Sequence, residues 1–404
     1  MIDSSIIKVH ALKNAVEHDG KAIIGSVINA LFNEGLQKEN IKEIMPTVVK
    51  IIAEVNTLSI EQQQKEFDNH PHKIAQRPKR IGLPELDNVG KKGIIMRFAP
   101  SPSGPLHLGH AITASMSYLY VKKYGGTLYI RIEDTNPENI YPPAYKMIEK
   151  EARWLFENKI KLVIQSQRMK KYYAAIEKLL KKNAVYVCTC SQETFKKYVK
   201  AKKNCPCREL ISLQQRKRWK KMFDKKGYKE GEAVVRFKSG MTNKNPAFRD
   251  FPLARINTNP HPLQKNKYKV WPLMNLAVAV DDMELKITHI IRAKDHRDNA
   301  EKQKLIFKIL RKKYPHDYYL GRIHLQDLEL STSKTRKEIE SGKYSGWDDP
   351  KLFTIASLKK QGYTPHAFLG LAENIGLNEV DKTLSRKELL LLLNTYNKKN
   401  KEVK

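Results

Sequence analysis

Residues 97–110 read R-F-A-P-S-P-S-G-P-L-H-L-G-H, and this stretch decides the fold. It follows an apolar run at residues 93–96 and leads into a helical pattern that ends at Gly125 and Gly126. A second apolar run, residues 128–132, comes next. A strand, a loop rich in glycine and proline, a helix and a second strand make a βαβ unit of a parallel sheet. Such sheets bind ligands at the carboxyl ends of their strands.

Two histidines, His107 and His110, lie three residues apart at the start of the expected helix. This spacing places two imidazole groups beside a helix N-terminus, which is an arrangement suited to phosphate. Gly109 lies between them and lacks a Cβ atom, so a flat base could rest against the backbone. Taken alone, the same spacing is about as typical of a metal-site fragment or of ordinary helix caps.

A second segment, E-L-S-T-S-K-T at residues 329–335, favours the phosphate interpretation. Together the two segments resemble the H-I-G-H and K-M-S-K-S signatures of class I aminoacyl-tRNA synthetases. The first is filled by residues 107–110. The second, at residues 331–335, has a degenerate S-T-S-K-x form similar to that of archaeal and eukaryotic glutamyl-tRNA synthetases. The resemblance extends over nearly the whole chain, through R-I-E-D-T at 131–135, V-W-P at 270–272, A-V-D-D at 279–282 and S-G-W-D-D-P at 345–350.

The resemblance implies an α/β fold with a Rossmann-like parallel sheet and an inserted α/β domain that binds the tRNA acceptor end. We expect a helical N-terminal extension at residues 1–90 and the two halves of the catalytic domain at 91–185 and 269–300. The insertion would occupy residues 186–268, and a helical stem-contact region 301–404. Apolar runs at 273–280 and 285–291 read as further strands of the sheet.

The resemblance implies ATP-dependent formation of glutamyl-adenylate, followed by transfer of glutamate to the 3′-terminal adenosine of tRNA-Glu. Charge develops on the phosphate oxygens, so such chemistry needs positioning and cations. His107, His110 and Lys334 are the expected catalytic residues, with Lys334 reaching the departing pyrophosphate from a mobile loop and Mg²⁺ sharing the charge. The expected ATP-binding residues are His107, Gly109, His110, Ser331, Thr332, Ser333, Lys334 and Thr335. The chain has no G-x-x-x-x-G-K-[ST] motif, which excludes a P-loop NTPase.

A dicarboxylic amino acid needs a cation for its side chain, and arginine binds a carboxylate with a bidentate fork. Arg97 and Arg292 lie at the ends of expected strands, and the alternative for both is an internal ion pair, for example with Asp134 or Asp295. By resemblance, glutamate is held by Arg97, Ser101, Glu133, Asn275 and Arg292, with Glu133 receiving the α-ammonium group. Trp271 stands at a usually aromatic position, where it lacks a hydroxyl group.

The chain has 75 Lys and Arg against 43 Asp and Glu, a formal net charge of +32. This excess indicates a polyanionic partner, with nucleic acid the first candidate and solubility alone the alternative. Residues 216–226 are basic with interleaved aromatics, which fits either a contact with the tRNA acceptor end or a solvated charged helix. No apolar run is long enough to span a bilayer, and charges interrupt the start of the chain, so we expect a cytoplasmic protein without membrane contact.

All four cysteines, Cys188, Cys190, Cys205 and Cys207, lie in one short segment. In a cytosolic protein, two C-x-C pairs indicate metal ligands rather than disulfides, and four thiolates can enclose a structural Zn²⁺ ion. The alternative is four free thiols. Related glutamyl enzymes carry a similar zinc knuckle at the start of the inserted domain, and these positions match it.

No strand-rich segment follows residue 390 that could form the two anticodon-reading β-barrels of full-length archaeal relatives. The expectation is a split enzyme with a separate polypeptide carrying these barrels, a minimal enzyme, or a trimmed chain. Three rival functions remain: an enzyme that transfers glutamate to a modified base of another tRNA, a glutaminyl enzyme, and a non-catalytic RNA-binding subunit. Arg292 disfavours the glutaminyl enzyme, and the two intact signatures disfavour the non-catalytic subunit.

Overall fold

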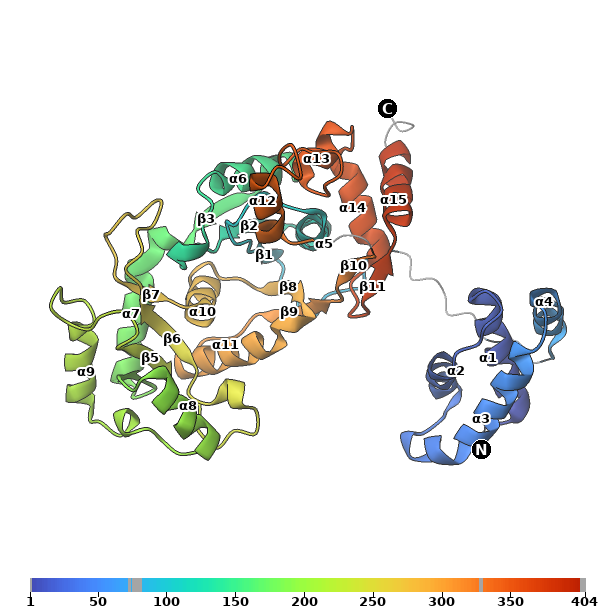
Figure 1. Ribbon diagram of the computed structural model, residues 1–404, viewed down its shortest axis with the longest axis horizontal. Coiled ribbons are helices and arrows are strands. Elements are labelled where there is room, and N and C mark those ends of the chain that lie inside the picture. The colour runs from blue at the N-terminus through green and yellow to red at the C-terminus, as the bar shows by residue number, and fades with distance from the viewer. Residues whose placement is uncertain (1, 72–73, 75–81, 327–329, 400–404) are drawn as a thin grey trace. The chain divides into compact units, whose positions relative to one another are not determined.

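The computed structural model covers 404 residues and describes residues 2–71, 74, 82–326 and 330–399 (Figure 1). The chain divides into two compact units, Met1–Arg80 and Ile81–Lys404. The basic segment R-P-K-R at residues 77–80, which the sequence predicts as a turn leading into the catalytic part, lies outside the described residues.

The described part of the first unit contains four α-helices, α1 (Ser4–Glu17), α2 (Ile24–Leu31), α3 (Ile41–Asn56) and α4 (Ile60–Asn69). Asp3 caps α1 by accepting a hydrogen bond from the Ser5 amide, and Ser59 forms a capping box with Gln62 at the start of α4. Apolar residues at helical spacing build its core, among them Ile7, Leu12, Val27, Leu31, Val48, Ile52 and Val55. The helical pattern of this part of the chain therefore reflects a packed core.

A parallel sheet organises the second unit. Strands β1 (Ile94–Phe98), β2 (Gly126–Ile132) and β3 (Lys161–Ile164) pair in the order β1-β2-β3, and β8 (His289–Ala293) pairs in parallel with β9 (His316–Leu320). The Thr288 amide, just before β8, donates to the Ile95 carbonyl of β1 at 2.9 Å, so β8 continues the sheet on the other side of β1. Segments from both halves of the chain thus meet at β1 (Figure 1).

Helix α5 (Leu108–Tyr124) connects β1 with β2 and ends at Gly125, as the sequence predicts. It packs against α14 (Pro365–Ile375), which in turn contacts α6 (Ala144–Leu155) and α15 (Arg386–Lys399). The remaining elements of this C-terminal part are α12 (Thr332–Glu340), α13 (Ile355–Lys360) and the short parallel pair β10 (Ile323–Leu325) and β11 (Lys382–Leu384). Residues from β1, β2, α5, α6 and α14 form one continuous apolar core.

The segment between β3 and β8 forms an antiparallel sheet in the order β4-β5-β6-β7. Its strands are β4 (Val185–Cys188), β5 (Val234–Phe237), β6 (Pro252–Ile256) and β7 (Val270–Pro272). Helices α7 (Met169–Lys181), α8 (Gln192–Ala201) and α9 (Ser212–Lys221) accompany it. Its core is shared with α10 (Met274–Glu284) and α11 (Arg297–Ile309), which lie after the sheet in the chain.

Three sequence predictions about elements are wrong. Residues 273–280 form most of helix α10, because a short apolar run buried on all sides has no periodicity that separates helix from strand. The strand predicted at 285–291 begins only at His289, since Lys286 has a left-handed backbone (φ 55°) after α10 ends. The region after residue 301 is not wholly helical, because β9, β10 and β11 interrupt it. In the described part of the chain, no helix is long and apolar enough to cross a membrane.

Candidate active site

A cavity of about 840 Å³ opens at the carboxyl ends of β1, β2 and β8. This is the edge of a parallel sheet at which ligands bind, and two sequence-distant halves of the chain meet there. Most residues predicted for glutamate and ATP line it: Arg97, Ser101, His107, Gly109, His110, Glu133 and Arg292. The fold thus brings together groups that lie up to 195 positions apart in the sequence.

His107 is the N-cap of α5, and its Nδ1 accepts a hydrogen bond from the His110 amide at 3.4 Å. Because Nδ1 is an acceptor, the neutral ring carries its proton on Nε2. The two rings stack with centroids 3.7 Å apart. Burial lowers the pKa of His110 to about 4, and burial together with His110 lowers the pKa of His107 well below its usual value. At neutral pH both rings therefore offer N–H donors but no positive charge.

The second signature segment lies against the first. Thr332 and Trp347 lie so close to Gly104 that a Cβ at that position would be 2.8 Å from the Trp347 ring. A small cavity between the segments is lined by His107, Ser331, Thr332 and Thr335. Ser331 caps α12, so the predicted loop is the start of a helix. Ser333 and Lys334 on its first turn are exposed.

Arg97 is paired inside the protein. Its Nε and Nη2 donate to the two carboxylate oxygens of Asp282 at 3.2 and 3.3 Å, and Asp282 is only 1% exposed. Burial lowers the pKa of Arg97, and Asp282 opposes this shift. Arg131 donates to the same carboxylate and, at 3.0 Å, to Glu133. The alternative of an internal ion pair therefore holds for Arg97, but with Asp282 rather than with Asp134.

In the part of the chain that the structure describes, Arg292 has no carboxylate partner. Its Nη1 donates to the Gln303 side-chain oxygen and its Nη2 to the Tyr314 hydroxyl, both at 3.1 Å. It is 7% exposed, its buried Nε has no hydrogen-bond acceptor, and no ion pair with it occurs among the described residues. Asp295, the predicted alternative partner, pairs instead with Arg322. A buried guanidinium at a cavity wall without a counter-charge is an energetically costly arrangement that an anionic ligand would relieve.

The other three predicted glutamate ligands differ in position. Glu133 lines the cavity beside Arg131, and burial raises its pKa while Arg131 and Arg97 lower it. Ser101 lines the same cavity and is exposed. Asn275 does not line it. Asn275 lies on α10, where it accepts a hydrogen bond from the Gln303 amide at 3.3 Å, so it reaches Arg292 only through Gln303.

Three residues at the site were missed by sequence reasoning, namely Asp282, Gln303 and Tyr314. Asp282 belongs to the A-V-D-D segment but had no assigned role, while Gln303 and Tyr314 carry no local pattern. Trp271 is 1% exposed, stacks on His261 at 5.0 Å and does not line the cavity. It acts as a packing residue here, and its indole nitrogen has no hydrogen-bond acceptor.

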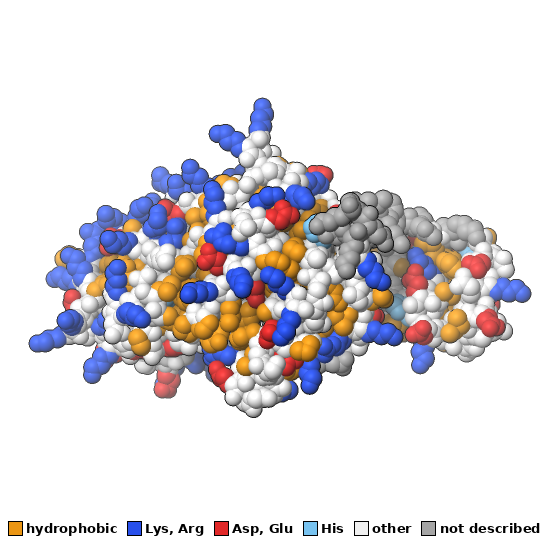
Figure 2. All heavy atoms as spheres, turned by 90° about the horizontal axis from the view of Figure 1, so that it is seen from above, with side chains coloured by type: hydrophobic (Ala, Val, Ile, Leu, Met, Phe, Trp, Pro, Cys, Tyr) orange, Lys and Arg blue, Asp and Glu red, His pale blue; other side chains and the backbone are white. Residues whose placement is uncertain are grey.

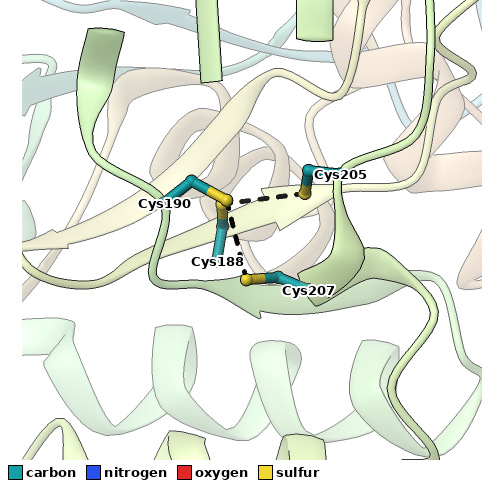
Figure 3. A group of neighbouring side chains, drawn as sticks. All are labelled: Cys188, Cys190, Cys205 and Cys207. Carbon is teal, nitrogen blue, oxygen red and sulfur yellow. Dashed lines mark hydrogen bonds between the residues drawn. The ribbon is translucent and has the colours of Figure 1, made fainter. Parts of the chain in front are cut away.

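The four cysteine sulfurs lie within 4.8 Å of one another (Figure 3). Cys188 and Cys190 lie at the end of β4, whereas Cys205 and Cys207 lie in a short 3-10 helical turn between α8 and α9. Cys188 and Cys205 are 3.9 Å apart, and Cys190 and Cys207 are 3.8 Å apart. Four thiolates about 2.3 Å from a tetrahedral Zn²⁺ would be about 3.8 Å from each other, so the cluster has the required size. Burial and the neighbouring thiols raise the pKa of Cys190 to about 11.

The basic segment at 216–226 includes the end of α9. Trp219 is 5% exposed and belongs to the core, so it cannot stack on a base, whereas Phe223 is 39% exposed. Lys and Arg side chains gather at the end of the molecule that carries α7, α8 and α9 (Figure 2). The positive charge supports a polyanionic partner at this end. Because Trp219 is buried, only Phe223 of the two aromatic residues is accessible for stacking on a base.

Comparisons with known proteins agree with this geometry. The family model of the catalytic domain of class I tRNA synthetases (E and Q) matches residues 93–397. The chain is 40% identical over 392 residues to the glutamate–tRNA ligase of Methanothermobacter marburgensis, covering 96% of this chain and 70% of that protein. It is 42% identical over 388 residues to that of Pyrococcus horikoshii, covering 94% and 68%.

A crystal structure of a glutamate tRNA ligase from Elizabethkingia meningosepticum in complex with its amino acid superposes with a TM-score of 0.55. It covers 75% of this chain and 69% of that one at 21% identity, a likeness that speaks for the fold alone. With the matched family model and relatives of about 40% identity over nearly all of its length, the chain belongs to the class I tRNA synthetases of the E and Q group.

Proposed function

We propose that this chain is a glutamate–tRNA ligase, which activates L-glutamate with ATP and esterifies it to the 3′-terminal adenosine of tRNA-Glu. Its curated relatives carry that name. The observation that carries the choice of amino acid is Arg292, a buried cation at the cavity wall without a carboxylate partner among the described residues. A site built this way favours a substrate with a side-chain carboxylate over the neutral amide.

The phosphates of ATP would lie at the start of α5. His107 donates there through Nε2–H, and the dipole of the helix adds partial positive charge at its N-terminus. Because both histidines are neutral, the full positive charge comes from Lys334, exposed on the first turn of α12 next to this site. When bound, Mg²⁺ shares the negative charge of the phosphates. We assign no general base, since the adenylate is already activated for attack by the ribose.

Glutamate would lie between β1 and β8. Arg292 and Arg97 receive the side-chain carboxylate. Arg97 contributes hydrogen-bond donors rather than net charge, because its own charge is paired with Asp282. Glu133 receives the α-ammonium group and Ser101 hydrogen-bonds the substrate. Asn275 contributes through Gln303 rather than by contact.

The insertion, residues 186–268, is proposed to receive the tRNA acceptor end and to contain one structural Zn²⁺ held by Cys188, Cys190, Cys205 and Cys207. The separations of the sulfurs favour a closed site, as does the composition of the cluster, which contains no His, Asp or Glu from the described residues. Such a metal would connect the end of β4 with the turn before α9, and it would not take part in the reaction.

The test is charging of unfractionated tRNA with labelled glutamate, with labelled glutamine as the matched control. A terminal ester on tRNA-Glu supports the proposal, whereas a base-linked product or charging with glutamine contradicts it. The assay is run with the chain alone and with a polypeptide that carries anticodon-binding β-barrels. A requirement for the second component would support the predicted split enzyme. Failure of both arms, with ATP and tRNA present, would favour a non-catalytic RNA-binding protein.

A further inference from the structure

Among the described residues, Arg292 donates hydrogen bonds only to neutral side chains. Its two terminal nitrogens donate to Gln303, which is 1% exposed, and to Tyr314. The Tyr314 hydroxyl donates onward to the same Gln303 oxygen at 3.4 Å, and the Gln303 amide donates to Asn275. Every polar atom of the Gln303 side chain is therefore used to orient the guanidinium, while none of these partners carries a charge.

The carboxylates that act on Tyr314, a hydrogen-bond partner of Arg292, are paired with other cations: Asp282 with Arg97 and Asp317 with Lys304. Arg97 faces the same cavity and is already paired with Asp282. His296 also lines the cavity, and burial, Arg292 and Arg97 all lower its pKa, so it is neutral at pH 7. Asp295 is engaged with Arg322. Three arginines line the cavity: Arg97 pairs with Asp282, Arg322 pairs with Asp295, and Arg292 has no ion pair among the described residues, so its charge remains available to a ligand.

We infer that Gln303 is a specificity-determining positioning residue, which fixes the Arg292 guanidinium and leaves the charge of Arg292 uncompensated. The preference for a side-chain carboxylate over an amide then depends on the neutrality of Gln303. This inference rests on the proposed function. A carboxylate at position 303 would hold Arg292 equally well but would neutralise it, since a buried ion pair presents little net charge to its surroundings.

The decisive variant is Gln303→Glu, which keeps the shape and the acceptor oxygen and adds one charge. The Asn275 amide can turn to donate to the new oxygen, which replaces the hydrogen bond that it now donates to Asn299 at 3.3 Å. The matched control is Gln303→Met, which removes the hydrogen bonds but stays neutral. The measured quantity is kcat/KM for glutamate divided by kcat/KM for glutamine, from pyrophosphate exchange in the presence of tRNA.

Gln303→Glu should lower this ratio by about 100-fold, the size of one lost charge-assisted interaction. Gln303→Met should raise the glutamate KM by about 10-fold and leave the ratio within about threefold of the parent value, because a poorly oriented cation still prefers an anion. Equal changes of the ratio in both variants would overturn the inference, since Gln303 would then act by shape alone.

Asn275→Asp provides a second test if Gln303→Glu does not fold, which thermal unfolding would reveal. It keeps the acceptor oxygen for the Gln303 amide and places a carboxylate one residue farther from Arg292. Its ratio should fall by about 3- to 10-fold, and an unchanged ratio would contradict the inference. The unmodified chain must charge tRNA with glutamate in the same assay. If it does not, the proposed function fails first, and this inference fails with it.

Discussion

Replacing Arg292 by methionine should make the ligand-free protein more stable while it removes the use of glutamate. The side chain is 7% exposed and has no carboxylate partner among the described residues, so burial of its charge opposes folding. Its removal leaves no neighbour unsatisfied, because Gln303 still accepts from Tyr314 and still donates to Asn275. A methionine of similar length packs against the same groups without a charge.

We expect a gain of about 1–3 kcal/mol in the free energy of unfolding, the range seen when buried ionic groups are replaced by apolar ones. At this chain length that corresponds to a rise of about 2 °C in Tm per kcal/mol. Loss of a bidentate, charge-assisted contact to the substrate is worth about 4 kcal/mol, so kcat/KM for glutamate should fall by about 1000-fold. Stability and activity therefore change in opposite directions.

The matched variant is Arg97→Met, which removes a paired arginine from the same cavity. It deprives Asp282 of two hydrogen bonds and leaves it only Arg131, so it should destabilise the protein by about 2–4 kcal/mol. Chemical denaturation of both variants without substrate measures this difference. Destabilisation of Arg292→Met by as much as Arg97→Met would show that Arg292 has a compensating partner, and the argument for an uncompensated charge would be refuted.

Four other expectations are open to measurement. Lys334→Ala should slow adenylate formation by about 100-fold and leave the glutamate KM within about twofold; equal losses in rate and binding would contradict its role at the phosphates. Metal analysis should find one Zn²⁺ per chain, and Cys207→Ser should release it and lower Tm; a stable, metal-free parent protein would exclude the site. Burial raises the pKa of Glu151 to about 8, although its carboxylate accepts the Leu106 amide at 2.7 Å. Between pH 4.5 and 8 the folded state therefore keeps a proton that the unfolded state releases, and the free energy of unfolding falls as pH rises through this window. Glu151→Gln should recover at most about 5 kcal/mol of that free energy above pH 8. A gain that is the same at pH 5 and pH 9 would exclude this linkage. Gly104→Ala should lower activity with little change in fold, because the added methyl group displaces Thr332 and Trp347; unchanged kinetics would show that the contact between the two signature segments is dispensable.

The sequence by itself determined what depends on neighbouring residues. The βαβ unit around residues 97–110, the start of α5 at the two histidines and its end at Gly125 follow from local turn and helix chemistry. The chemistry of the two signature segments and of the four cysteines was also readable, because each is a contiguous pattern whose residue types limit what it can do. The cavity brings the first signature segment together with four of the five residues predicted to hold glutamate.

Only the tertiary structure decided which charges meet. Arg97 and Asp282 are 185 positions apart, and no local signal separates Asp282 from Asp134 or Asp295 as its partner. The same holds for Gln303 and Tyr314, which contact Arg292 only because α11 and the segment before β9 pack beside β8. Helix α10 was mistaken for a strand because complete burial erases the periodicity that distinguishes the two. Local patterns specify secondary-structure elements and reactive groups, whereas long-range packing decides which charged side chains form ion pairs. Here that packing pairs Arg97 with Asp282 and leaves Arg292 without an ion pair among the described residues.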